Sequence, residues 1–438
     1  MLPWLGFPAA GALWATWHLR KMYYFYDEWS MIYIGSHFKA LDGMTTSFNG
    51  HLWMMEYWIY RIQVSVFGLD SRFFISACFV VAIVALHLSI AAVLRACDLP
   101  RQLSLMIGGL LAYLGCASQN FIFTVQVSLV LSMAAGLFGA AIVLRNLPST
   151  RAIVGTGLCL LASSVLASGV AIGVVAFAGV IAAIRWRWAA VSAVAPAAIV
   201  LVWWFTTAEL GEHYPAALGD RVSFASRLLL QSVGAVAGNE RAVGAMLSGV
   251  AMTLIVVALV CRWLDKRAVT LLVAGIASAI VTAAAIAQSR AGIRGFNFEN
   301  FNRYLSYVAI PLTLAAAPAL VAVVRNIPFG KRQTSLVRAV PAGAVAIAFI
   351  LGLSTASSYT ELFEVWNVQT RHDVVAATLV INEGCPSGVA PDPASFPTSY
   401  NPQLTTQLLR ELVERGALSI GPTEAADPVV TARMCPEV

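Results

Sequence analysis

Apolar runs separated by short polar turns recur along almost the whole chain. About 20 consecutive apolar residues allow an α-helix to cross the ~30 Å of hydrocarbon in a bilayer. Eleven runs approach or reach that length, which predicts an all-α, polytopic transmembrane helical bundle. We place the spans at residues 2–17, 72–94, 103–118, 124–144, 152–168, 170–184, 188–206, 243–261, 268–287, 304–324 and 339–356.

Composition agrees with a membrane protein. Charged residues make up 11% of the chain and hydrophobic residues 59%, whereas soluble domains contain roughly 25% and 45–50%. The long Ala, Val, Leu and Ile blocks lack the alternation that a membrane β-barrel requires. A soluble protein and a β-barrel are therefore both excluded.

The charged residues predict the orientation of the bundle. One set of short loops carries Arg95, Arg101, Arg145, Arg151, Arg185, Arg187, Arg262, Lys266, Arg267, Arg325, Lys331, Arg332 and Arg338. These 13 basic residues are accompanied by two acids, Asp98 and Asp265. Because basic loops stay in the cytoplasm, we expect the N-terminus inside, the C-terminus outside and a plasma-membrane location. The net charge of +6 then reflects topology and does not indicate nucleic-acid binding.

The longer segments fall on the outer side, at residues 18–71, 207–242 and 288–303. Within the first, "NGHLWMMEYWIYRIQVSVFG" predicts a helix in the membrane interface. Its expected apolar stripe is formed by Leu52, Met55, Ile59, Ile62 and Val66. Residues 221–234 form a second candidate for an interfacial helix.

The sequence divides into a transmembrane domain at residues 1–356 and an extracytoplasmic tail at residues 357–438. The tail predicts helices at 359–381 and 403–415, separated by a proline-rich stretch. Cys385 and Cys435 lie in this tail, where oxidising conditions would permit a disulfide.

An acid pair is the first candidate for chemistry. Asp27 and Glu28 in "YYFYDEWSMI" follow the first span directly. An acid at the end of a span normally points to water or into the bundle, so the pair is either a solvated loop feature or a functional one. Asn49 and His51 are expected at the start of the interfacial helix, where a helix N-terminus favours anions. A structural role for this histidine is the alternative.

Amides and arginines provide the other candidates. Asn120 and Gln126 lie in the outer hairpin "SQNFIFTVQ", where they either cap and join helices or bind a polar substrate. "QSRAGIRGFNFENFNRYLSY" places Arg290, Arg294, Arg303 and Tyr304 on the outer side, against the positive-inside rule. Guanidinium groups there either reach lipid headgroups or bind a phosphate through paired hydrogen bonds.

Together these residues suggest sugar transfer from a polyprenyl-phosphate donor to a hydroxyl acceptor at the outer membrane boundary. A carboxylate would take the acceptor proton. An arginine would stabilise the phosphate leaving group as charge builds on it. Two further interpretations stay open: a transporter or flippase for lipid-linked saccharides, and a non-catalytic scaffold. A transporter would place ionisable groups near the midplane, where His87 is the main example, and we expect this residue to be a packed core histidine.

The motifs "DEW", "FNGHLWMMEYWIYRIQVSVFGLD", "QNFIFTVQVSLVLSMAAGLFG" and "NRYLSYVA" resemble bacterial integral-membrane glycosyltransferases of the GT-C superfamily, in particular an actinobacterial type. The resemblance implies a GT-C-like fold and an inverting transfer to a cell-envelope glycan or glycolipid. It also implies Asp27 as general base, Glu28 as its substitute, Arg303 at the lipid phosphate and His51 at the substrate. No cofactor is required. The cluster Glu209, Glu212, His213 and Asp220 matches no firm metal pattern, and a divalent ion bound there stays open as an alternative.

Overall fold

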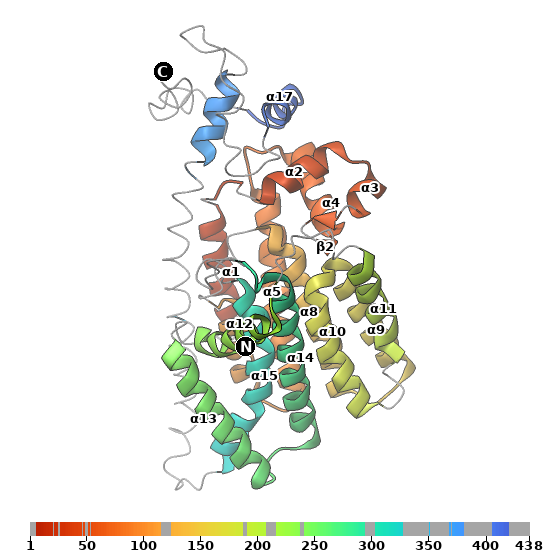
Figure 1. Cartoon of the computed structure of the whole chain (residues 1–438), viewed down its shortest axis with the longest axis vertical. Coiled ribbons are helices and arrows are strands. Elements are labelled where there is room, and N and C mark those ends of the chain that lie inside the picture. The colour runs from red at the N-terminus through yellow and green to blue at the C-terminus, as the bar shows by residue number, and fades with distance from the viewer. Residues whose placement is uncertain are drawn as a thin grey trace.

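Figure 1 shows the computed structural model of the chain. It describes residues 6–20, 22–24, 27–45, 47–48, 51–52, 54–114, 124–186, 191–206, 216–236, 241–293, 303–326, 350, 368, 370–380 and 405–419. Within these ranges every regular element is a helix, apart from one pair of two-residue strands. The prediction of a helical bundle is confirmed.

The described helices coincide with ten of the eleven predicted spans. They are α1 (Gly6–Leu19), α5 (Phe73–Ala96), α6 (Arg101–Ala112), α8 (Val127–Arg145), α9 (Thr150–Leu166), α10 (Ser168–Arg185), α11 (Val191–Thr206), α13 (Arg241–Val260), α14 (Lys266–Arg290) and α15 (Arg303–Asn326). The eleventh, residues 339–356, lies outside the described residues except for position 350. Four helices, α5, α8, α14 and α15, are long and apolar enough to cross a membrane. Shorter apolar helices are found within α9, α10, α11 and α13.

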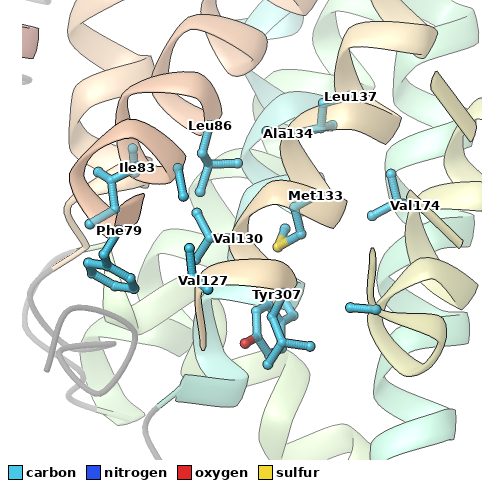
Figure 2. Close-up of a cluster of buried hydrophobic side chains, with 14 of the residues drawn as sticks. Phe79, Ile83, Leu86, Val127, Val130, Met133, Ala134, Leu137, Val174 and Tyr307 are labelled. Carbon is cyan, nitrogen blue, oxygen red and sulfur yellow. The ribbon is translucent and has the colours of Figure 1, made fainter. Parts of the chain in front are cut away.

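The centre of the bundle is a continuous apolar cluster between α5, α8, α10 and α15. Figure 2 shows Phe79, Ile83 and Leu86 of α5 opposite Val127 and Val130 of α8, with Met133, Leu137, Val174 and Tyr307 completing the cluster. Phe79 and Tyr307 are both buried. This packing fixes where α8 begins relative to α5 and α15, which matters for the site described below.

Glycines allow the helices of the bundle to approach closely. A Cβ atom on Gly173 of α10 would collide with the Thr282 hydroxyl of α14. A Cβ atom on Gly275 of α14 would collide with the Pro311 carbonyl of α15 and lie 2.7 Å from the Ala315 Cβ. Because lipid tails are as apolar as leucine, helices in a membrane associate through such close packing of small residues.

The outer segment forms a layer over one end of the bundle (Figure 1). It consists of α2 (Asp27–His37), α3 (Ala40–Thr45), β1 (Ser47–Phe48), β2 (His51–Leu52), α4 (Met54–Ile62) and the π-helix η2 (Gln63–Phe67). The strands pair antiparallel, with Ser47 opposite Leu52 and Phe48 opposite His51. The prediction that a helix begins at Asn49 is therefore wrong: α4 begins at Met54. The sequence between the paired residues is Asn-Gly, the dipeptide that favours a tight hairpin over a helix start.

The expected apolar stripe on α4 is also wrong. Ile59 is buried, whereas Val66 is 69% exposed. The helix changes from α to π geometry at Gln63, and the extra residue per turn moves Val66 to a different face. Tyr57 and Tyr60 of α4, which a helix in the membrane interface would place at headgroup level, are buried in the protein. The aromatic side of α4 packs into the protein, against α2.

The C-terminal tail shares its core with the outer segment. A helix at residues 370–380 and α17 (Thr406–Glu414) are described, which confirms the helix predicted at 403–415 and part of that at 359–381. Val374, Leu408 and Leu412 belong to the same buried cluster as Tyr24 and Trp29. The tail therefore adds to the outer layer, next to α2 (Figure 1), and has no separate core of its own among the described residues.

The second candidate for an interfacial helix, residues 221–234, is helical. It lies within α12 (Leu218–Ala235), which packs on α13, α14 and α15. Phe224 and Leu228 are buried against this group, whereas Leu218 and Val222 are exposed. An amphipathic helix of this kind accounts for the weaker hydrophobic pattern of the segment.

We expect Gly275→Ala to lower the thermal unfolding midpoint in detergent, because the new methyl group overpacks the contact between α14 and α15. Overpacking of this kind lowers the free energy of unfolding by about 1–3 kcal/mol. Gly249→Ala on α13 is the matched control, since its Cβ would meet no atom within 4 Å. Replacing an unhindered glycine inside a helix by alanine stabilises the folded state by about 0.5–1 kcal/mol. Equal effects of the two substitutions would contradict the close contact.

Candidate functional site

The acid pair is divided by the structure. Glu28 is 1% exposed, and its Oε1 atom forms an ion pair at 2.6 Å with Nη2 of Arg72. Arg72 is the residue directly before α5, and its side chain is 6% exposed. Two ions buried in this way are stable only when further hydrogen bonds satisfy them.

Those hydrogen bonds come from three other parts of the chain. The hydroxyl groups of Tyr60, at 3.0 Å, and of Thr124 donate to Glu28 Oε1. Arg72 Nη2 donates to the Thr124 hydroxyl at 2.8 Å, and Nη1 donates to the Tyr23 carbonyl. The ring of Tyr24 lies 5.0 Å from the Arg72 guanidinium carbon. Burial, together with the negative charge of Glu28, raises the pKa of Tyr60, so this phenol remains a donor.

Asp27 lies next to this network but differs from Glu28 in exposure. It is the first residue of α2 and is partly exposed, whereas its neighbour points into the protein. Consecutive residues at a helix start face different directions, since each advances by about 100° around the axis. The N-terminus of α2 also favours the negative charge of Asp27. The sequence could not assign these two roles within the pair.

The short 3₁₀ helix η4 (Thr124–Gln126) connects the acid network to α15. Thr124 contacts Glu28 and Arg72, and two residues later Gln126 accepts a hydrogen bond at 3.0 Å from Tyr307 of α15. Both Gln126 and Tyr307 are buried. This contact favours the helix-joining interpretation of Gln126. It also ties the start of α15, with Arg303 and Tyr304, to the turn that holds Glu28.

A second buried carboxyl group lies beside the first. Glu56 of α4 accepts hydrogen bonds at Oε1 from the Ser128 amide, at 2.9 Å, and from the Ser128 hydroxyl. Its Oε2 atom is buried and has no hydrogen-bond partner among the described residues. Burial raises the pKa of Glu56 to about 8, against the opposing effect of the Ser128 hydrogen bonds.

Glu56 and Tyr60 are four residues apart on α4, and Thr124 of η4 and Ser128 of α8 are also four residues apart. Side chains at this spacing share one helix face. The two pairs therefore meet as two successive polar contacts, Tyr60 with Thr124 and Glu56 with Ser128. Sequence reasoning missed this arrangement, although two polar residues four apart on an otherwise apolar helix are its signal.

Arg72 was also missed as a site residue. It stands immediately before a span on the side predicted to be outer. An arginine there departs from the positive-inside rule, the same signal that identified Arg290, Arg294 and Arg303.

The remaining predicted site residues are only partly described. Asn49, Asn120 and Arg294 lie outside the described residues. His51 is described as part of β2, which contacts α10, and Arg303 as the first residue of α15. Arg290 is partly buried at the end of α14, and Tyr304 packs at the edge of the apolar core. The structure thus joins α2 and α15 through η4.

His87 has the expected structural role. It is buried in α5, and its Nε2 atom lies 2.8 Å from the Leu105 carbonyl oxygen of α6. Of the acidic cluster considered for a metal, Asp220 lies in the first turn of α12, and Glu209, Glu212 and His213 lie outside the described residues. Cys385 and Cys435 also lie outside them.

Comparison with protein-family models, with curated proteins and with solved structures finds no match to this chain. Functional assignment therefore rests on the chemistry and geometry of its own residues. The class defined by the fold is a helical protein with four helices able to cross a membrane.

We expect Glu56→Gln to change how stability depends on pH. The folded state binds the Glu56 proton more tightly than the unfolded state, so the contribution of Glu56 to the stability of the wild type falls as pH rises from about 4.5 through about 8. A shift of that size corresponds at most to roughly 5 kcal/mol. The thermal midpoint of Glu56→Gln in detergent, measured relative to that of wild type, should therefore rise as pH is raised from 5 to 9.

Asp42→Asn is the matched control for this titration, because Asp42 is an exposed carboxylate in the same outer layer. It should follow the wild-type pH trend. A constant difference between wild type and Glu56→Gln across this range would show that Glu56 does not titrate between the two states.

Proposed function

We propose that this protein is a membrane glycosyltransferase of the GT-C type, which transfers a sugar from a polyprenyl-phosphate donor to a hydroxyl group of a cell-envelope glycan or glycolipid. Asp27 is the general base. The observation that carries the proposal is the buried contact of Glu28 with Arg72, Tyr60 and Thr124, which fixes the start of α2 and leaves Asp27 partly exposed beside it.

The reaction is an inverting displacement. Asp27 takes the proton of the acceptor hydroxyl as its oxygen attacks the anomeric carbon from the face opposite the phosphate. The bond between the anomeric carbon and the phosphate oxygen breaks, and polyprenyl phosphate leaves with the electron pair. A base positioned for this step contributes about 10²–10⁴-fold to the rate. No cofactor is consumed.

The cationic residues of the late outer segment serve the leaving group. Arg290, Arg294 and Arg303 are proposed to bind the phosphate, because guanidinium groups pair with phosphate through two parallel hydrogen bonds. His51, Asn49 and Asn120 are assigned to the sugar and acceptor, with Tyr304 beside them. The link from Glu28 through η4 to Tyr307 supports a shared location for base and phosphate-binding groups.

Glu28 has a different role from the one the resemblance implies. Its Oε1 atom accepts hydrogen bonds from Arg72, Tyr60 and Thr124 within the protein. We therefore assign Glu28 to holding α2 in place, and Asp27 alone to proton transfer.

We further propose eleven crossings, with the N-terminus in the cytoplasm. Arg267 of α14 lies 3.4 Å from the Asp98 carboxylate, and Arg325 of α15 donates to the Asp98 carbonyl. Basic residues from distant segments thus gather at the end of α5 opposite Arg72. That gathering is the pattern expected of the cytoplasmic side.

The tail gives a second argument for the number of crossings. Because the tail packs on the outer segment, both lie on one side of the membrane, so an even number of spans must separate them. Among the described residues, nine predicted spans follow Arg72, with α12 counted as an interfacial helix. They are α5, α6, α8, α9, α10, α11, α13, α14 and α15. The apolar run 339–356 supplies the tenth.

We expect Asp27→Asn to reduce sugar transfer by about 10²–10⁴-fold while the thermal midpoint stays near that of wild type. Transfer is measured with purified protein and a panel of polyprenyl-phosphate-linked sugars. Asp42→Asn, an exposed acid of α3, should keep full activity. Glu28→Gln should instead destabilise the fold by about 3–5 kcal/mol, because it leaves Arg72 buried without its counter-charge.

Full activity of Asp27→Asn would remove the proposed base. Movement of a lipid-linked saccharide across liposomes without any sugar transfer would identify a flippase instead.

The topology is tested by labelling single cysteines in a cysteine-free background. Lys39→Cys and Arg410→Cys should react with a membrane-impermeant maleimide in intact cells, because both residues are exposed in the outer layer. Arg151→Cys, exposed at the opposite end, should react only after permeabilisation. Labelling of position 39 from the cytoplasmic side would overturn the orientation.

A further inference from the structure

Tyr23 is held between two arginines that are far apart in the sequence. Arg72 donates to its carbonyl oxygen. Nη1 of Arg371, from the tail, donates to its hydroxyl at 3.0 Å, and the Arg371 guanidinium carbon lies 4.7 Å from its ring centre. The buried ring of Tyr23 packs edge-on against Trp29 of α2, with centroids 6.1 Å apart. The residue therefore connects the bundle, the tail and α2.

The position of Arg371 is fixed because the helix that carries it is buried against the rest of the protein. It lies at the start of the helix 370–380, and Val374, Ala377 and Val380 on this helix are buried in the protein. A guanidinium over an aromatic ring contributes about 0.5–2 kcal/mol, more when both are shielded from water. The contact is thus a fixed part of the outer layer.

The tail also holds the opposite end of α2. The Glu411 carboxylate of α17 lies 2.7 Å from Nε2 of His37, and Arg415 donates to the Ser36 carbonyl at 3.2 Å. The Leu69 amide donates to the Ala417 carbonyl at 2.5 Å. Contacts at both ends of α2 leave the tail little freedom to shift without moving this helix.

We propose that Arg371 is a positioning residue for Asp27, acting through Tyr23, so that sugar transfer depends on the docked C-terminal tail. The inference rests on the proposed function, because it assigns a base to α2. Tyr23 precedes Asp27 by four residues and packs directly on α2. A displacement of about 1 Å in a reacting group can cost about 10²-fold in rate.

The kinetic test compares Arg371→Ala with wild type in the same transfer assay. We expect kcat to fall at least about tenfold, with KM for the lipid-linked donor changed less than about twofold, because the base is misplaced and donor binding is not. Arg371→Lys should recover part of kcat. Millimolar guanidinium ion should also partly restore Arg371→Ala, a rescue that general destabilisation would not produce.

Arg410→Ala is the matched control, because Arg410 is an exposed arginine of the same tail, on α17. It should keep the wild-type kcat. Tyr23→Phe removes the hydroxyl contact and keeps the ring, and should lower kcat in the same direction. If Arg371→Ala does not fold, Tyr23→Phe and Arg371→Lys decide the matter by the same split between kcat and KM.

Hydrogen exchange provides a readout that needs no activity. Amides of residues 22–31 should exchange faster in Arg371→Ala and Tyr23→Phe than in wild type, and Arg410→Ala should leave them unchanged. Wild-type kcat or wild-type exchange in both Arg371→Ala and Tyr23→Phe would overturn the inference. If Asp27→Asn abolishes transfer while Arg371→Ala is fully active, the proposed function stands and the positioning role fails. If wild type transfers no sugar, the proposed function fails, and exchange alone decides whether the tail orders α2.

Discussion

The ion pair between Glu28 and Arg72 is the constraint on which the outer layer depends. Burying two charges costs several kcal/mol each, and their attraction offsets this cost only with suitable geometry and additional hydrogen bonds. Thr124 and Tyr60 supply those bonds to Glu28. Four segments that are distant in the sequence must therefore be in place together. If any one of them were displaced, a buried charge would lose a hydrogen bond that satisfies it. The interaction holds the start of α2 against three other segments of the chain, which is the placement that the proposed base needs.

The same region extends the polar contacts toward the rest of the bundle. Ser128 binds Glu56 one helical turn beyond Thr124, and Gln126 between them binds Tyr307 of α15. The start of α8 and the turn before it thus receive side chains from α2, α4, α15 and the residue before α5, while apolar packing along α8 fixes its position (Figure 2). The tail contributes Arg371, which contacts Tyr23 before α2. The proposed base, Asp27, is a partly exposed carboxylate at the edge of a buried hydrogen-bonded network. Groups fixed before the reaction are the kind of surroundings that favour proton transfer, because they need not reorganise during it.

The sequence predicted the helices well and the outer layer poorly. Hydropathy of each span is a local property, and α5, α8 and α14 begin and end within three residues of the predicted limits. The helix predicted to begin at Asn49 begins instead at Met54. The spacing of the apolar residues favoured a helix over the whole stretch, whereas the Asn-Gly turn decides the local structure before Met54. Arg72 gave no local sign of its partner, since Glu28 lies 44 residues away, and Arg371 lies 348 residues from Tyr23.

The amino-acid sequence by itself determined the positions of the helices, their apolar character, the basic loops and the residue types available for chemistry. Each of these is a local property, since a helix satisfies its backbone hydrogen bonds within its own segment. The tertiary structure decided which acid of the pair is buried, which hydroxyl groups hold it, and that the tail packs on α2. Such choices depend on desolvation and on pairing between distant segments, which no local pattern contains.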